Sequence, residues 1–262
     1  MFNRPDRTYN YSPDLINKIL KKSNHPLKVI TDLIEDNTTV LDIGAGNGIL
    51  TELLRFKYSN VIIDGIEKNR YGGNISRSKY RNFYQGDAQN FFNIFQNEQY
   101  DYIVLADIIE HLTDPYTLLK KLVNSIPVST KIILTTPNIS FGAVRISLLH
   151  GDFDYTDSGI LERTHLRFFN IKSLKLMLKK LDVYTELIIN LQRNYLKSEI
   201  NLRKYKFEFV NFLKLKKDVY SSTYQFLVLL NKRKVDCQEI FRGQSTNLKD
   251  YLSFRLKALR IF

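Results

Sequence analysis

The sequence has few of the residues that form covalent or metal-based crosslinks. Its 262 residues include one cysteine, Cys237, two methionines and no tryptophan. A single cysteine cannot form an internal disulfide, and zinc sites built from several cysteines are excluded. No apolar run approaches the roughly 18 residues that a membrane span needs. The segment 1–6 also lacks the apolar core of a signal peptide, so we expect a cytoplasmic protein.

A basic excess is confined to the last third of the chain. The formal net charge is +12. Residues 1–130 contain 15 Lys or Arg and 15 Asp or Glu, whereas residues 171–262 contain 20 against 8. Such an excess favours an anionic partner, which would be nucleic acid, a membrane surface or a phosphorylated substrate. The alternative is a lysine-rich, solvated surface without a partner.

The most informative stretch is Asp42-x-Gly44-x-Gly46-x-Gly48. It follows a short apolar run and precedes an apolar-periodic segment that starts at Ile49. This order predicts a strand, a tight glycine turn and a helix. Glycine lets the backbone approach a ligand closely, and the start of a helix offers unpaired N–H groups. The spacing differs from the G-x-G-x-x-G of dinucleotide-binding proteins, and it resembles motif I of the class I S-adenosylmethionine (SAM)-dependent methyltransferases.

Three further acids directly follow expected strands: Glu67, Asp87 and Asp107. A carboxylate at the tip of the second strand can accept both hydroxyls of a ribose. Carboxyl ends of parallel strands meet at one edge of the sheet, where ligands bind. The resemblance also implies that Asp87 binds the adenine amino group of SAM. The expected cofactor-binding residues are Asp42, Gly44, Ala45, Gly46, Gly48, Glu67, Lys68, Asp87, Ala88, Ala106 and Asp107.

The alternation of strands and helices predicts an α/β fold. Apolar and β-branched runs separated by helices imply a doubly wound, mostly parallel sheet with helices on both faces. Residues 183–191 and 224–231 are expected to form the two last strands. The resemblance implies a Rossmann-like, seven-stranded methyltransferase sheet that ends in an antiparallel strand.

We expect three segments along the chain. Residues 1–37 form a helical lead-in that covers the cofactor site, and residues 38–235 form the methyltransferase domain. Inside that domain, residues 137–169 are a long acceptor loop, and residues 195–221 are a basic insertion between the last two strands. Residues 236–262 form a basic amphipathic C-terminal helix. Docking on its own domain is the main prediction for this helix, with dimerisation and peripheral membrane contact as alternatives.

The segment from Asp107 to Pro115 resembles motif IV of small-molecule methyltransferases, including its His-Leu-x-Asp-Pro ending. SAM carries an activated methyl group, so the protein mainly aligns acceptor, carbon and sulfur. A hydroxyl acceptor benefits from a nearby base, and histidine has a suitable pKa. We predict His165 as the general base and His111 as a residue that shapes the pocket. A structural role for His165 in its loop stays open, with His150 as the reserve base.

A metal ion is a further alternative. Asp107-x-x-Glu110-His111 resembles the acid-x-x-Glu-His of ubiquinone-pathway O-methyltransferases, in which a divalent ion orients the acceptor oxygen. Metal-free methyltransferases share Glu-His-Leu at this point, so the main prediction is a site without metal.

The stretch from Gly159 to Asn170 resembles methyltransferases found with bacterial surface-polysaccharide enzymes. We therefore predict a SAM-dependent O-methyltransferase that acts on a sugar or glycan precursor. A nucleotide- or lipid-linked, anionic acceptor would suit the basic C-terminal half, and would place the protein in the cytoplasm or at the inner face of the membrane. The rivals are an RNA methyltransferase, against which no RNA-binding module is recognised, and a non-catalytic SAM-binding or membrane-associated protein.

Overall fold

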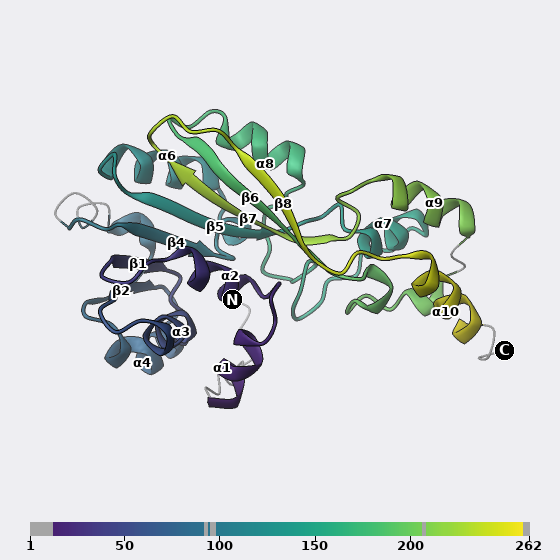
Figure 1. Cartoon of the computed structure of the whole chain (residues 1–262), viewed down its shortest axis with the longest axis horizontal. Helices are drawn as coiled ribbons and strands as arrows, with labels where there is room; N and C mark the ends of the chain where they lie inside the picture. The colour runs from purple at the N-terminus through teal and green to yellow at the C-terminus, as the bar shows by residue number, and fades with distance from the viewer. Residues whose placement is uncertain (1–12, 92–93, 95–97, 206–207, 259–262) are drawn as a thin grey trace.

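A computed structural model describes residues 13–91, 94, 98–205 and 208–258. Its centre is one eight-stranded sheet in the order β3-β2-β1-β4-β5-β7-β6-β8 (Figure 1). The strands are β1 (Thr39–Ile43), β2 (Ile62–Glu67), β3 (Phe83–Gln85), β4 (Tyr102–Ala106), β5 (Lys131–Pro137), β6 (Tyr184–Gln192), β7 (Thr223–Asn231) and β8 (Gln238–Gly243). β7 runs antiparallel to β5 and β6, and all other pairs are parallel. The doubly wound sheet predicted from the sequence is confirmed.

The expected number of seven strands is wrong, because β8 adds an eighth at the edge of the sheet. β8 pairs in parallel with β6. It lies in the segment 236–262, which was expected to be one helix, and α10 (Leu248–Ala258) occupies only a later part of that segment. Most β8 residues are exposed, and Ile240 and Phe241 are adjacent rather than alternating. The period-2 signal of a strand is therefore missing from this stretch.

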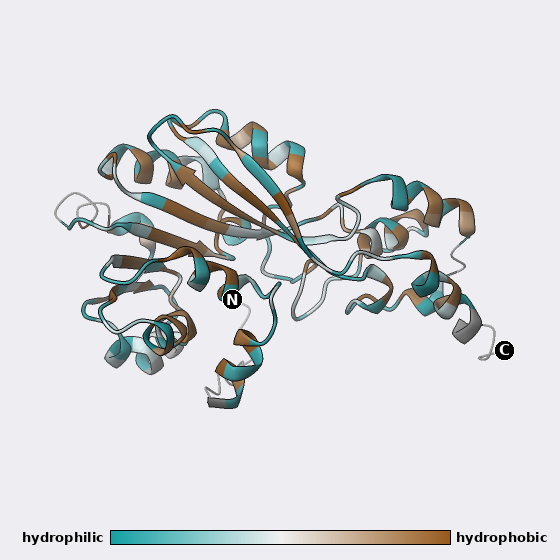
Figure 2. Cartoon of the chain, viewed as in Figure 1, coloured by the Kyte–Doolittle hydropathy of each residue, from teal (hydrophilic) through white to brown (hydrophobic). Residues whose placement is uncertain are grey.

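Helices cover both faces of the sheet. α6 (Pro115–Ser125) and α8 (Ile171–Leu178) pack on one face, and α2 (Pro26–Leu33) and α3 (Ile49–Lys57) pack on the other. Figure 2 shows the apolar residues, in brown, along the central strands β4, β5 and β7 between these layers. The two faces give the sheet two separate apolar cores, so its central strands are buried on both sides.

The lead-in contains two helices within its described residues. α1 (Pro13–Leu20) packs on α3, with Ile16 and Ile19 against Leu53. The expectation for residues 1–12 lies outside the described part of the chain. Nowhere in the described ranges is a helix both long and apolar enough to cross a membrane.

A separate lobe, on the right of Figure 1, is formed by α7 (Gly142–Leu149), α9 (Phe209–Lys217) and α10. Its core includes Phe141, Tyr195 and Phe212. The Tyr251 ring of α10 stacks on Phe212 with centroids 4.7 Å apart, so α10 docks on its own chain. The helix α7 interrupts residues 137–169, which were expected to be one long loop. That expectation was wrong because the lobe supplies a buried core for α7.

Gly65 on β2 is required by the packing of Tyr80. A Cβ at Gly65 would lie 2.8 Å from the Tyr80 ring. The Tyr80 hydroxyl in turn donates to Asp42 Oδ2 at 2.8 Å. We expect Gly65→Ala to lower the free energy of unfolding by about 1–3 kcal/mol, because the ring has to shift. Urea unfolding measures this loss.

The Tyr80→Ala background serves as the control for this substitution. If the ring is the obstacle, Gly65→Ala should cost much less once the ring is removed. An equal loss in both backgrounds would contradict this explanation.

Candidate functional site

The turn after β1 depends on glycine. Gly44, Gly46 and Gly48 have φ values of +82°, +54° and +75°, which other residues rarely adopt. The N–H groups of Gly44 and Ala45 donate to the carbonyl oxygen of Ile66 at 2.8 and 3.0 Å. The turn is therefore fixed to the end of β2, and Gly48 leads directly into α3.

Glu67, the last residue of β2, holds the same turn through its side chain. Its Oε2 accepts from the Gly46 N–H at 2.7 Å, and its Oε1 accepts from the Asn69 N–H at 2.6 Å. The residue is 8% exposed. A carboxylate has about four lone-pair sites, so Glu67 can accept two further hydroxyl groups without losing these bonds.

Asp42 lies inside the sheet layer and is 3% exposed. Its Oδ2 accepts the hydrogen bond from Tyr80. Burial raises the pKa of Asp42 to about 7, the Tyr80 bond opposes this rise, and the nearby Glu67 charge adds to it. The structure thus buries the Asp42 side chain against the Tyr80 hydroxyl, two positions before the first glycine of the turn.

Asp87 follows β3 and begins the short helix η2 (Ala88–Asn90) by accepting from the Gln89 N–H at 3.0 Å. Its Oδ2 accepts from Lys68 Nζ at 2.8 Å. The Lys68 side chain is 77% exposed. Ion pairs this exposed contribute little stability, so a ligand amino group can replace Lys68 at Asp87.

Asp107 follows Ala106, the last residue of β4, and has a left-handed backbone with φ of +57°. The Thr135 hydroxyl on β5 donates to Asp107 Oδ1 at 2.7 Å, and Gln225 on β7 donates to the same oxygen. Burial raises the pKa of Asp107. Three strands therefore fix this carboxylate at the carboxyl edge of the sheet.

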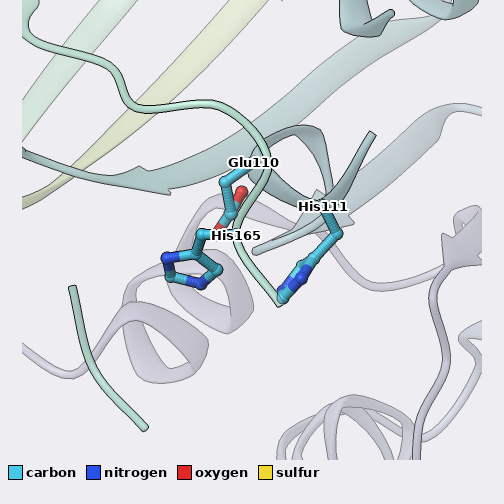
Figure 3. Close-up of side chains that lie close together, drawn as sticks. All are labelled: Glu110, His111 and His165. Carbon is cyan, nitrogen blue, oxygen red and sulfur yellow. The ribbon is translucent and has the colours of Figure 1, made fainter. Parts of the chain in front are cut away.

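The short helix η3 (Ile109–His111) brings Glu110 and His111 next to His165 (Figure 3). The two imidazole rings meet edge to face, with centroids 4.8 Å apart. His111 Nδ1 lies 3.1 Å from the Thr164 carbonyl oxygen, and His165 Nδ1 lies 2.8 Å from the Ile160 carbonyl oxygen. A carbonyl oxygen only accepts, so each neutral ring carries its proton on Nδ1 and its lone pair on Nε2.

Glu110 ties this helix to the loop that carries His165. Its carbonyl oxygen accepts from the N–H groups of Leu166 and Arg167 at 2.8 and 3.0 Å. Its side chain is 1% exposed, and neither carboxylate oxygen has a hydrogen bond of good geometry among the described residues. Burial raises the pKa of this carboxyl well above its usual range, the Asp107 charge adds to the rise, and Thr136 opposes part of it.

The two other histidines, His150 and His25, lie outside the cluster of Glu110, His111 and His165. His150 follows α7, and its ring stacks on Tyr205 in the lobe. His25 precedes α2, and burial lowers its pKa to about 4. The structure therefore brings His111 and His165 together and leaves the reserve base His150 outside this cluster.

The residues after β1, β2, β3 and β4 all lie at the carboxyl edge of the sheet. The strand order reverses between β1 and β4, which is where doubly wound sheets bind ligands. The sequence did not indicate Tyr80, Thr135 or Gln225 as supports of this edge. They reach it from other elements, so no local pattern marks them.

The raised pKa of Asp42 makes the stability of the fold depend on pH. Its folded value of about 7 exceeds its usual 3.8, so the folded state binds the proton more tightly. Stability is therefore lost as the pH rises between these values. We expect wild type to lose stability relative to Asp42→Asn between pH 4 and pH 8, on the order of 4 kcal/mol. Urea unfolding at both pH values measures the difference.

Glu35→Gln is the control, since Glu35 is an exposed carboxylate just before β1. Its pH profile should follow that of wild type. Parallel profiles for Asp42→Asn and wild type would show that Asp42 titrates as it does in the unfolded chain.

Solved structures of methyltransferases share this fold. A SAM-dependent methyltransferase from Archaeoglobus fulgidus matches with a TM-score of 0.56 and 18% identity, over 85% of this chain and 100% of that chain. Magnesium protoporphyrin IX methyltransferase from Synechocystis PCC 6803, solved with bound S-adenosylhomocysteine (SAH), matches with a TM-score of 0.55 and 11% identity, over 86% and 90%. The chain therefore has the α/β fold of SAM-dependent methyltransferases.

Sequence comparisons add a relative and a family. The mitochondrial ubiquinone biosynthesis O-methyltransferase of Dictyostelium discoideum is 26% identical over 132 residues, which are 45% of this chain and 41% of that protein. The match thus spans less than half the length of the relative. The family described as methionine biosynthesis protein MetW matches residues 24–223. Because this range covers well over half of the sequence, the chain belongs to the MetW family.

Proposed function

We propose that this protein is a SAM-dependent methyltransferase whose cofactor lies over the turn after β1. The observation that carries this proposal is the position of four groups at one edge of the sheet: the glycine turn, Glu67, Asp87 and Asp107. One solved structure of the same fold is named as a SAM-dependent methyltransferase, and another methyltransferase of this fold holds SAH. Both facts support SAM as the cofactor.

Each group has a distinct part in binding the cofactor. Glu67 accepts the ribose hydroxyls with the lone pairs that its backbone bonds leave unused. Asp87 accepts from the adenine amino group after Lys68 moves away. The methionine end lies between Gly44 and Asp107. The other backbone contacts come from the remaining residues of this edge, which are Ala45, Gly46, Gly48, Ala88 and Ala106.

Methyl transfer is an in-line displacement from the sulfonium of SAM to the acceptor atom, and it leaves SAH. We place His165 and His111 on the acceptor side, because η3 follows Asp107 after β4 and brings His111 against His165. The Nε2 lone pair of His165 can accept the proton of an acceptor hydroxyl. We therefore place these two histidines in contact with the acceptor or with a group that holds it.

A small molecule fits this acceptor side better than a polymer. His165 is 7% exposed, and its loop is bonded to the main chain of Glu110, which closes the site. The sugar or glycan hydroxyl predicted from the sequence agrees with a small acceptor. The family description, however, refers to methionine biosynthesis, so hydroxyl and thiol compounds of that pathway belong in the same screen.

The alternative proposal, in which RNA is the acceptor, rests on the basic last third of the chain. Several of its cations are already in ion pairs with carboxylates: Lys175–Glu239, Arg193–Glu199, Lys197–Asp250 and Lys204–Asp152. These pairs involve four of the 20 cations in residues 171–262, and the excess of cations over carboxylates there, 20 against 8, persists. What favours a small acceptor over RNA is therefore the burial of His165 and not the charge of this region.

Calorimetric titration with SAH tests the cofactor site. We expect wild type to bind SAH and Glu67→Gln to bind about 10–100-fold more weakly, because charge-assisted hydrogen bonds to the ribose are lost. Glutamine keeps the length of the side chain and one acceptor oxygen, so it disturbs the glycine turn less than alanine would. Asp87→Asn should also weaken SAH binding.

Lys68→Ala and Glu35→Gln are the matched controls. Lys68 was expected from the sequence to bind the cofactor, and here we propose instead that it competes for Asp87. Lys68→Ala should therefore bind SAH as tightly as wild type or more tightly. Glu35→Gln lies at the opposite edge and should leave affinity unchanged. Well-folded wild type that fails to bind SAH would refute the proposed function. If SAH binds, labelled SAM is then offered with nucleotide sugars, methionine-pathway compounds and RNA.

A further inference from the structure

Glu110, His111 and His165 form a cluster of metal-ligating side chains from two segments of the chain. One nitrogen or carboxylate oxygen from each residue lies within 4.8 Å of the other two (Figure 3). Glu110 and His111 come from η3, and His165 comes from the loop that is bonded to η3. In a metal site, three such atoms would each lie about 2.0–2.2 Å from one ion.

The two imidazoles are held as metal-binding histidines usually are. Each has its Nδ1 against a backbone carbonyl oxygen, from Thr164 for His111 and from Ile160 for His165. Such bonds fix the ring and its tautomer and direct the Nε2 lone pair to the ion. Both carbonyl partners belong to the same loop, so the loop orients both rings.

Within the described ranges, the Glu110 carboxylate lacks the hydrogen-bond partner that a buried acid normally has. Both of its oxygens are buried without a hydrogen bond of good geometry among the described residues, and the same holds for the nearby Thr136 hydroxyl oxygen. Burying a charge is costly unless it is paired or bound to a metal. A cation bound to Glu110 would balance the charge of its carboxylate.

We propose that Glu110, His111 and His165 bind one divalent transition-metal ion of the zinc class. Two imidazoles and one carboxylate are a donor set typical of zinc sites that keep an open fourth position. Magnesium is a less suitable ion, because it prefers oxygen ligands. The open position takes water or the acceptor oxygen, and this last point rests on the proposed function.

This ligand set differs from the one that the sequence suggested as an alternative, which was Asp107, Glu110 and His111. Asp107 is held by Thr135 and Gln225, whereas His165 stands against the ring of His111. A histidine whose Nε2 binds a metal cannot also accept a proton there. The metal site and the role of His165 as a general base therefore exclude each other, and one experiment decides between them.

The test is a titration of the full chain, freed of metal with a chelator, with zinc alone against a chromophoric competitor. We expect one ion per chain, and at least tenfold weaker binding in His165→Ala, His111→Ala and Glu110→Gln. His150→Ala should match wild type, because His150 lies in the lobe. Cobalt in place of zinc should give the intense visible absorption of a four-coordinate site in wild type and lose it in His165→Ala.

Folding and ligand binding are separated by two further measurements. Glu110→Gln should not lower the melting temperature of the metal-free protein, because the described residues give the buried carboxylate no hydrogen bond of good geometry to lose. Zinc should raise the melting temperature of wild type and not that of Glu110→Gln.

Three results would overturn the proposal: no stoichiometric zinc binding, equal weakening by His150→Ala, or a strong effect of Asp107→Asn together with none of His165→Ala. The titration contains no SAM or acceptor. SAH binding without zinc binding would therefore refute the metal site and leave the proposed function standing.

Discussion

The bond between the Glu67 carboxylate and the turn after β1 is the contact on which the rest of the site depends. Glu67 ends β2, and its two oxygens hold the N–H groups of Gly46 and Asn69. The Ile66 carbonyl oxygen holds two more N–H groups of the same turn. A glycine turn would otherwise be free to adopt many conformations. These bonds fix it at the point where the strand order reverses. Next to the turn, the Tyr80 hydroxyl donates to the buried Asp42 carboxylate.

Hydrogen bonds to backbone groups also position the residues of the acceptor side. The Glu110 carbonyl oxygen holds the loop at Leu166 and Arg167, and carbonyl oxygens of that loop orient both histidines. The loop and η3 therefore position each other. The Glu110 side chain is left buried without a hydrogen bond of good geometry in the described part of the chain, and this kind of local cost is typical of functional sites.

The sheet and its carboxyl edge could be predicted because their signals are local. Apolar runs mark the strands, and the glycine turn and the acids Glu67, Asp87 and Asp107 stand in the sequence where the strands end. The supports from β5 and β7, Thr135 and Gln225, could not be predicted, since only strand pairing brings them to Asp107. The contact between the His165 and His111 rings could not be predicted for the same reason, because the two residues are 54 positions apart. β8 was missed because an exposed edge strand has no apolar alternation.

The most direct test of the central claim is an experimental structure of the full chain with SAH bound. We expect the ribose hydroxyls to donate to Glu67 while its bonds to Gly46 and Asn69 remain. The adenine amino group should donate to Asp87 in place of Lys68. The sulfur should face Asp107, with His165 and His111 beyond it. SAH at another place, or at this edge with its ribose turned away from Glu67, would contradict the account.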